Sequence, residues 1–130
     1  MKILFVCKGN VGRSQMAEAL YKLLGNKNHE VFSAGITLSG PEESLKSIPA
    51  DYVIKVIAEE GADISEAFRT QITPEMMDSA DKIIVIVEES YIIPEYFKNN
   101  PKVKVWNVED PKGTDLETHR KIKDQIKELI

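Results

Sequence analysis

Cys7 and Arg13 are separated by five residues near the N-terminus of this 130-residue chain, and Ser14 follows directly. A cysteine thiolate is a strong nucleophile, and a guanidinium can bind two oxygens of a tetrahedral anion with its planar fork. A serine hydroxyl can donate a hydrogen bond to the sulfur. These residue types at this spacing indicate nucleophilic attack by a cysteine on a bound oxyanion such as a phosphoryl group.

The residues between the cysteine and the arginine favour a loop that wraps around an anion. Glycine and asparagine tolerate backbone conformations that aim successive N–H groups into one concavity. A helix that begins after the loop would add the positive end of its dipole and stabilise a thiolate. We therefore predict that the phosphate is bound by Lys8, Gly9, Asn10, Val11, Gly12, Arg13 and Ser14.

Cys7 has a simpler interpretation as a small buried residue at the end of a strand, with Arg13 as a surface cation of a helix. A core cysteine needs neither the glycines nor the arginine, so we favour the nucleophile. A departing alkoxide or phenoxide also needs a proton donor. Asp110, followed by Pro111, is the candidate, although an Asp-Pro pair can simply form a turn. The predicted catalytic residues are Cys7, Arg13 and Asp110.

Apolar strand-like runs alternate with amphipathic stretches along the whole chain. The predicted strands cover residues 2–6, 31–34, 82–87 and 103–107. This alternation predicts an α/β fold with a doubly wound, four-stranded parallel sheet in the order 2-1-3-4, with helices on both faces. Ligands of such sheets bind where the strand order reverses, between the first and third strands. The Cys7 loop and the Asp110 loop are both expected at that edge.

The helices are predicted from the spacing of apolar residues and from their end signals. The first helix should bury Leu24 together with residues 16, 20 and 23. A second is expected between residues 49 and 61, and a short third after residue 74. Thr114 and Glu117 form a predicted capping box for the last helix.

Length and composition favour a single domain over residues 1–130. Acids and bases are interleaved at a net charge of −4, so we expect neither nucleic acid nor membrane as a partner. The one cysteine is typical of a reducing compartment, and we expect a cytoplasmic monomer. His29 and His119 lack metal-ligand spacing and are expected on the surface, and no metal or other cofactor is predicted.

Residues 6–20, VCKGNVGRSQMAEAL, resemble the signature of the low-molecular-weight protein tyrosine phosphatases and of the arsenate reductases related to them. Ser33-Ala34-Gly35, residues 69–73 and Asp110-Pro111 follow in the order of that family, so the similarity covers nearly the whole chain. The resemblance implies hydrolysis of phosphotyrosine proteins or small aryl phosphates through a phosphocysteine on Cys7. Asp110 would act first as the acid and then as the base, and Asn10 would hold the loop open.

Several positions depart from the family pattern. Gly12 stands where many members have a second cysteine, so the protective disulfide of those members is absent. Lys8 replaces a commonly uncharged residue and would favour an acidic peptide or a second phosphate. Val11 favours phosphotyrosine, because the related arginine phosphatases have threonine there. Lys112 and Gly113 follow Asp110-Pro111 in place of two tyrosines that wall the family's pocket.

Other residues near the predicted site are less decisive. An aromatic wall could instead come from residues 91, 96 and 97, or these rings could pack beneath their loop. Glu88 and Glu89 are expected in a solvent-facing acidic loop, and Trp106 in the core.

Three other functions remain open. The first is arsenate reduction, because Gln15 is typical of the arsenate reductases. Thioredoxin-coupled reductases need further cysteines, one of them expected close to Val87, and this chain has only Cys7. The only reductase that fits is therefore a single-cysteine enzyme that uses an external thiol. A phosphocarrier could also hold phosphocysteine, although Arg13 and Asp110 suit a hydrolase better. The last alternative is a catalytically silent binding module.

Overall fold

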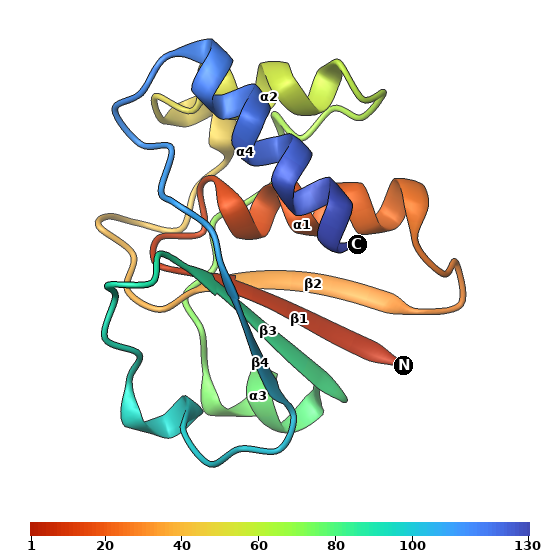
Figure 1. Cartoon of the computed structure of the whole chain (residues 1–130), viewed down its shortest axis with the longest axis vertical. Coiled ribbons are helices and arrows are strands. Elements are labelled where there is room, and N and C mark those ends of the chain that lie inside the picture. The colour runs from red at the N-terminus through yellow and green to blue at the C-terminus, as the bar shows by residue number, and fades with distance from the viewer.

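A computed structural model describes all residues, 1–130, and shows one four-stranded sheet (Figure 1). All neighbouring strands are parallel, in the order β2-β1-β3-β4. The strands are β1 (Lys2–Cys7), β2 (Glu30–Gly35), β3 (Lys82–Val87) and β4 (Val103–Asn107). The predicted fold class and strand order are confirmed.

Helices cover both faces of the sheet (Figure 1). One face carries α1 (Arg13–Leu24), α2 (Asp51–Ala58) and α4 (Leu116–Leu129), and the other carries the short α3 (Pro74–Ser79). Two 3₁₀ turns, η1 (Leu45–Ser47) and η2 (Glu95–Phe97), lie in the connecting segments. No helix has the length and apolar character that crossing a membrane requires.

The central strands β1 and β3 are continuous apolar runs because both of their faces are buried. In β1, Ile3 and Phe5 belong to the larger core beneath α1, α2 and α4, whereas Leu4 and Val6 belong to the smaller core beneath α3. Successive side chains of a strand point to opposite faces, which produces this division. Both sides of β1 are therefore fixed, and the position of Cys7 at its end is fixed with them.

Three predictions about the helices and the core need correction. Leu24 is 55% exposed, because α1 extends beyond the edge of the core. The N-cap of α4 is Asp115, whose carboxylate accepts the Thr118 N–H at 2.9 Å, while the predicted cap Thr114 donates to the carbonyl of Pro111. Trp106 is only half-buried, with its ring 5.9 Å from that of Phe5.

His119 is also buried, contrary to the expected surface position. Its ring Nδ1 lies 2.8 Å from the carbonyl of Asp115 and 3.2 Å from the hydroxyl of Thr114, and its edge contacts Tyr52 on α2. The apolar body of the imidazole thus fills space between α2 and the start of α4. Sequence spacing alone does not reveal this contact, because α2 and α4 are far apart in the chain.

Candidate active site

The sulfur of Cys7 lies at the junction between β1 and the loop that leads into α1. Cys7 is the last residue of β1 and Arg13 is the first of α1, so strand and helix fix the two ends of the loop. Asn10 adopts a positive φ of 55° in between, a conformation that asparagine tolerates better than most residues. This bend belongs to the predicted phosphate-binding loop.

Asn10 is completely buried and its side-chain amide links three parts of the chain. The amide oxygen accepts the backbone N–H of Thr70 at 2.8 Å, which fixes the orientation of the amide group. The amide nitrogen then donates to the hydroxyls of Ser14 at 2.7 Å and Ser33 at 3.0 Å. The loop is held from within by these bonds, as the family resemblance implied for Asn10.

The bond from Asn10 also determines which way the Ser14 hydroxyl points. Ser14 Oγ lies 3.0 Å from Cys7 Sγ, and either atom could donate on geometry alone. Because Ser14 already accepts an N–H from Asn10, its own proton is free to point at the sulfur. The arrangement therefore provides a hydrogen-bond donor for a thiolate at Cys7.

Arg13 lies under the loop with only 2% of its side chain exposed. Its Nη1 donates to the carbonyl of Val108 at 2.8 Å and to Glu88 at 3.0 Å. Its Nη2 is 3.6 Å from the carboxylate of Asp110. Arg13 is thus a buried cation that joins the ends of β3 and β4 to the Cys7 loop.

Glu88 is not in a solvent-facing loop, and this prediction was wrong. Its side chain is 17% exposed and bridges Arg13 and Lys8, with Lys8 Nζ at 2.9 Å. Burial raises the pKa of Glu88, but hydrogen bonds from Lys8 and Arg13 outweigh that effect and bring the pKa to about 2. The same bond to Glu88 raises the pKa of Lys8 above its usual value. Glu88 is therefore the counterion of both cations.

Asp110 lies at the rim of the site, as expected from its position after β4. One carboxylate oxygen accepts the backbone N–H of Lys112 at 3.0 Å, and the other lies 3.6 Å from both Arg13 and Lys8. A third of its side chain is exposed. It is therefore held in place and remains accessible to a ligand above Cys7.

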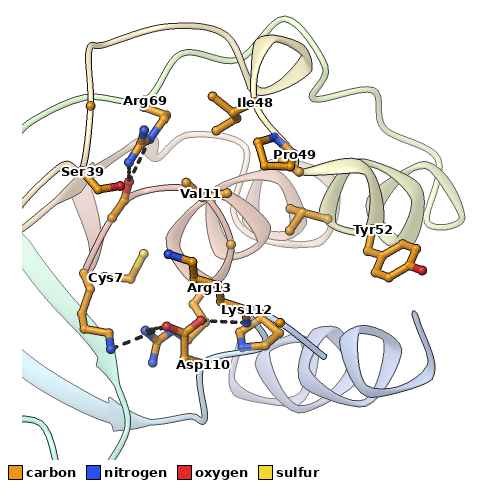
Figure 2. A pocket seen from close by; sticks show the side chains of 18 of the residues that line it. Cys7, Val11, Arg13, Ser39, Ile48, Pro49, Tyr52, Arg69, Asp110 and Lys112 are labelled. Carbon is orange, nitrogen blue, oxygen red and sulfur yellow. Dashed lines mark hydrogen bonds and ion pairs between the residues drawn. The ribbon is translucent and has the colours of Figure 1, made fainter. Parts of the chain in front are cut away.

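One pocket of about 840 Å³ lies at the Cys7 loop. Figure 2 shows the Cys7 sulfur directed into it, with Asp110 on one side and Arg69 and Ser39 on the other. Cys7, Arg13 and Asp110 all line the pocket, and of the predicted phosphate-binding residues only Asn10 and Ser14, which are wholly buried, do not. The structure thus places the three predicted catalytic residues at one pocket.

The aromatic side chain that lines the pocket comes from α2, which is not among the predicted sources of an aromatic wall. Tyr52, on α2, lines the pocket and is held by an edge contact with His119 at 5.3 Å between ring centroids. Of the three candidates, Phe97 is buried in the smaller core and Tyr96 is half-exposed outside the pocket. The Tyr91 ring lies 5.6 Å from the Lys8 nitrogen. Arg69 is a further lining residue that the prediction did not include.

A loop that joins a cysteine to a buried arginine, with a carboxylate at its rim and at the carboxyl edge of a parallel sheet, defines a class of cysteine-dependent oxyanion enzymes. Residues 2–130 match the family described as low molecular weight phosphotyrosine protein phosphatase, and the chain belongs to that family.

Known proteins resemble the chain over nearly its full length. A low molecular weight protein tyrosine phosphatase from T. tengcongensis superposes with a TM-score of 0.80 at 30% identity, covering 99% of this chain and 94% of that one. A solved arsenate reductase in its phosphate-binding state gives 0.79 at 33%, covering 98% and 92%. A glutaredoxin arsenate reductase from Synechocystis sp. is 33% identical, covering 99% and 92%.

Proposed function

We propose that the chain hydrolyses aryl phosphomonoesters, phosphotyrosine first among them, through a phosphocysteine on Cys7. The observation that carries this proposal is the donor arrangement at the sulfur: Asn10 orients Ser14, and Ser14 faces Cys7 Sγ at 3.0 Å. Such a donor stabilises the thiolate before attack and again when it is released. Arg13 and Asp110 supply the charge and the proton that the two transfers need.

In the first step the Cys7 thiolate attacks phosphorus and the bond from phosphorus to the leaving oxygen breaks. Asp110, as the neutral acid, protonates that oxygen and becomes a carboxylate. The loop N–H groups and the Arg13 fork bind the equatorial oxygens, where charge spreads in the transition state. Arg13 is already within 3.6 Å of Asp110, so the same guanidinium can reach both the phosphoryl group and the acid.

In the second step the Asp110 carboxylate takes a proton from water while the water oxygen attacks phosphorus. The bond from phosphorus to sulfur breaks, inorganic phosphate forms and the Cys7 thiolate is regenerated beside Ser14. We expect the substrate to be a phosphotyrosine protein or a small aryl phosphate, whose ring would approach Tyr52. We further expect a monomer that acts in the cytoplasm, where a lone cysteine stays reduced.

Arsenate reduction is the second candidate, and the names of the relatives favour it. Arsenate would condense with the Cys7 thiol and lose water. An external thiol would then attack the Cys7 sulfur, arsenite would leave with the electron pair of the sulfur–arsenic bond, and a mixed disulfide would remain. A second external thiol would reduce this disulfide and restore Cys7. External thiols are required, because Cys7 is the only cysteine.

Two assays on the same preparation separate these candidates. The first measures phosphate release from p-nitrophenyl phosphate and from a phosphotyrosine peptide at mildly acidic pH, with a chelator present. The second measures thiol-dependent arsenite formation from arsenate. Turnover of the phosphoesters with inert arsenate supports the phosphatase. Arsenite formation without phosphoester turnover would replace it with the single-cysteine reductase.

A further inference from the structure

We propose that Arg69 forms a second anion-binding subsite in the active-site pocket, which takes a carboxylate or a second phosphate of the phosphorylated substrate. The identity of the ligand rests on the proposed function, whereas the subsite itself rests on the geometry of Arg69. The subsite would select, among aryl phosphates, those with a further negative group close to the ring.

Arg69 is a buried cation without a counterion. The residue is 5% exposed, and no carboxylate oxygen lies within 4.0 Å of its guanidinium. Nε and Nη2 donate to the carbonyl of Gly9 at 3.2 and 3.1 Å, and Nη1 has no partner within the protein. Burying an arginine is costly unless an anion compensates its charge. An anionic ligand would provide that compensation.

The free end of Arg69 faces the pocket. A Cβ atom on residue 40 would lie 3.7 Å from Arg69 Nη1. Because residue 40 is glycine, this side of Nη1 stays accessible. Figure 2 shows Arg69 beside Ser39, on the side of the Cys7 sulfur opposite Asp110. Gly40, Ser39 and Arg69 all line the pocket. A ligand group here would be next to the phosphate loop and would not compete with the acid.

The other cations of the pocket are engaged or exposed. Lys8, which the sequence suggested for a second anion, is paired with Glu88 at 2.9 Å and lies 3.6 Å from Asp110. Lys112 is exposed, so water screens its charge. Glu43 also lines the pocket, but its carboxylate forms no ion pair with Arg69. Arg69 is therefore the better recognition residue.

The loop brings Arg69 near the nucleophile. Gly9 is two residues beyond Cys7, so their Cα atoms are at most about 7.6 Å apart. The Arg69 guanidinium is bonded to the carbonyl of that glycine. We therefore expect the second anionic group to be a meta or para substituent of an aryl phosphate, or an acidic residue next to phosphotyrosine.

Calorimetry with non-hydrolysable ligands tests the subsite without turnover. We would titrate phenylphosphonate, its 3- and 4-carboxy derivatives and a benzene diphosphonate into the wild type, Arg69→Gln, Arg69→Lys and Lys112→Gln. The wild type should bind at least one dianionic derivative about tenfold more tightly than the parent, the contribution of one charge-assisted hydrogen bond. Comparing the carboxylates with the diphosphonate identifies the preferred group.

The variants assign the preference to one residue. Arg69→Gln should reduce the preference below about twofold, Arg69→Lys should retain part of it, and the matched control Lys112→Gln should retain nearly all of it. For each variant, the affinity for a dianionic derivative is divided by the affinity of the same variant for phenylphosphonate. A general loss of phosphonate binding therefore cancels and is not mistaken for a loss of the preference. A wild type that binds all ligands equally, or an Arg69→Gln variant that keeps the preference, overturns the subsite. A clear preference in a protein that hydrolyses no phosphoester would overturn only the proposed function.

Discussion

Replacing Glu88 with glutamine should destabilise the protein at neutral pH and much less at acidic pH. Glutamine keeps the shape of a protonated glutamate but removes the charge that pairs with Arg13 and Lys8. The pKa of Glu88 falls from 4.5 to about 2 on folding, which corresponds to about 3 kcal/mol at roughly 1.4 kcal/mol per pH unit. The carboxylate is buried enough for this figure to need little discount for solvent screening.

The sign of the pH dependence follows from the lowered pKa. A carboxylate whose pKa is depressed in the folded state contributes its full stability above the unfolded value, here 4.5, and loses it as the pH falls toward about 2. The stability difference between wild type and Glu88→Gln should therefore be about 3 kcal/mol at pH 7 and about 1 kcal/mol at pH 3.

Urea unfolding followed by circular dichroism at pH 7, 4.5 and 3 measures this difference. Glu89→Gln is the matched control, because Glu89 is the exposed neighbour of Glu88, and its effect should be within about 0.5 kcal/mol at every pH. A Glu88→Gln effect that is equally large at pH 3 and pH 7 would show that the ion pairs with Arg13 and Lys8 do not stabilise the fold in this way.

Three other substitutions test separate parts of the site. Asp110→Asn should slow turnover of phenyl phosphate roughly a hundredfold but affect p-nitrophenyl phosphate much less, and equal losses would remove Asp110 from the acid role. Asn10→Ala should cost at least about 3 kcal/mol in unfolding free energy, whereas Asn10→Gly, which keeps the φ of 55° accessible, should cost less; equal costs would mean that backbone conformation plays no part. Tyr52→Ala should raise KM for aryl phosphates about threefold to tenfold with kcat retained and leave alkyl phosphates unchanged, and a parallel loss on both would refute the aromatic wall.

The sheet and the Cys7 loop were predictable because their signals are local. The β1 and β3 runs are apolar throughout, as strands covered on both faces must be, and the loop carries its glycines, Asn10 and Arg13 within one short segment. Asp110 was found because parallel strands end at one edge, so loops distant in sequence meet there.

The missed features depend on contacts between distant segments. In the sequence, nothing distinguishes Glu88 from other acidic residues that follow a strand, because its partners Arg13 and Lys8 are about 80 residues away. Nothing in the sequence shows that His119 is buried either, because its contact with Tyr52 joins two distant helices. Arg69 belongs to the segment 69–73 that follows the family order, but nothing in the sequence shows that it lies beside Gly9 and Gly40. At the α4 N-terminus, Thr114 and Asp115 are both good caps, and sequence alone does not decide between them.

The most direct test of the central claim is to trap the intermediate. Wild type, Cys7→Ala and Asp110→Asn would be mixed with a phosphotyrosine peptide, quenched with denaturant within milliseconds to seconds, digested and analysed by mass spectrometry. We predict a transient phosphoryl group on the Cys7 peptide of the wild type that decays as phosphate is released, one that lasts longer in Asp110→Asn, and none in Cys7→Ala. Turnover without any phosphoryl group on Cys7, or a phosphocysteine that persists in the wild type as in a phosphocarrier, would contradict the mechanism.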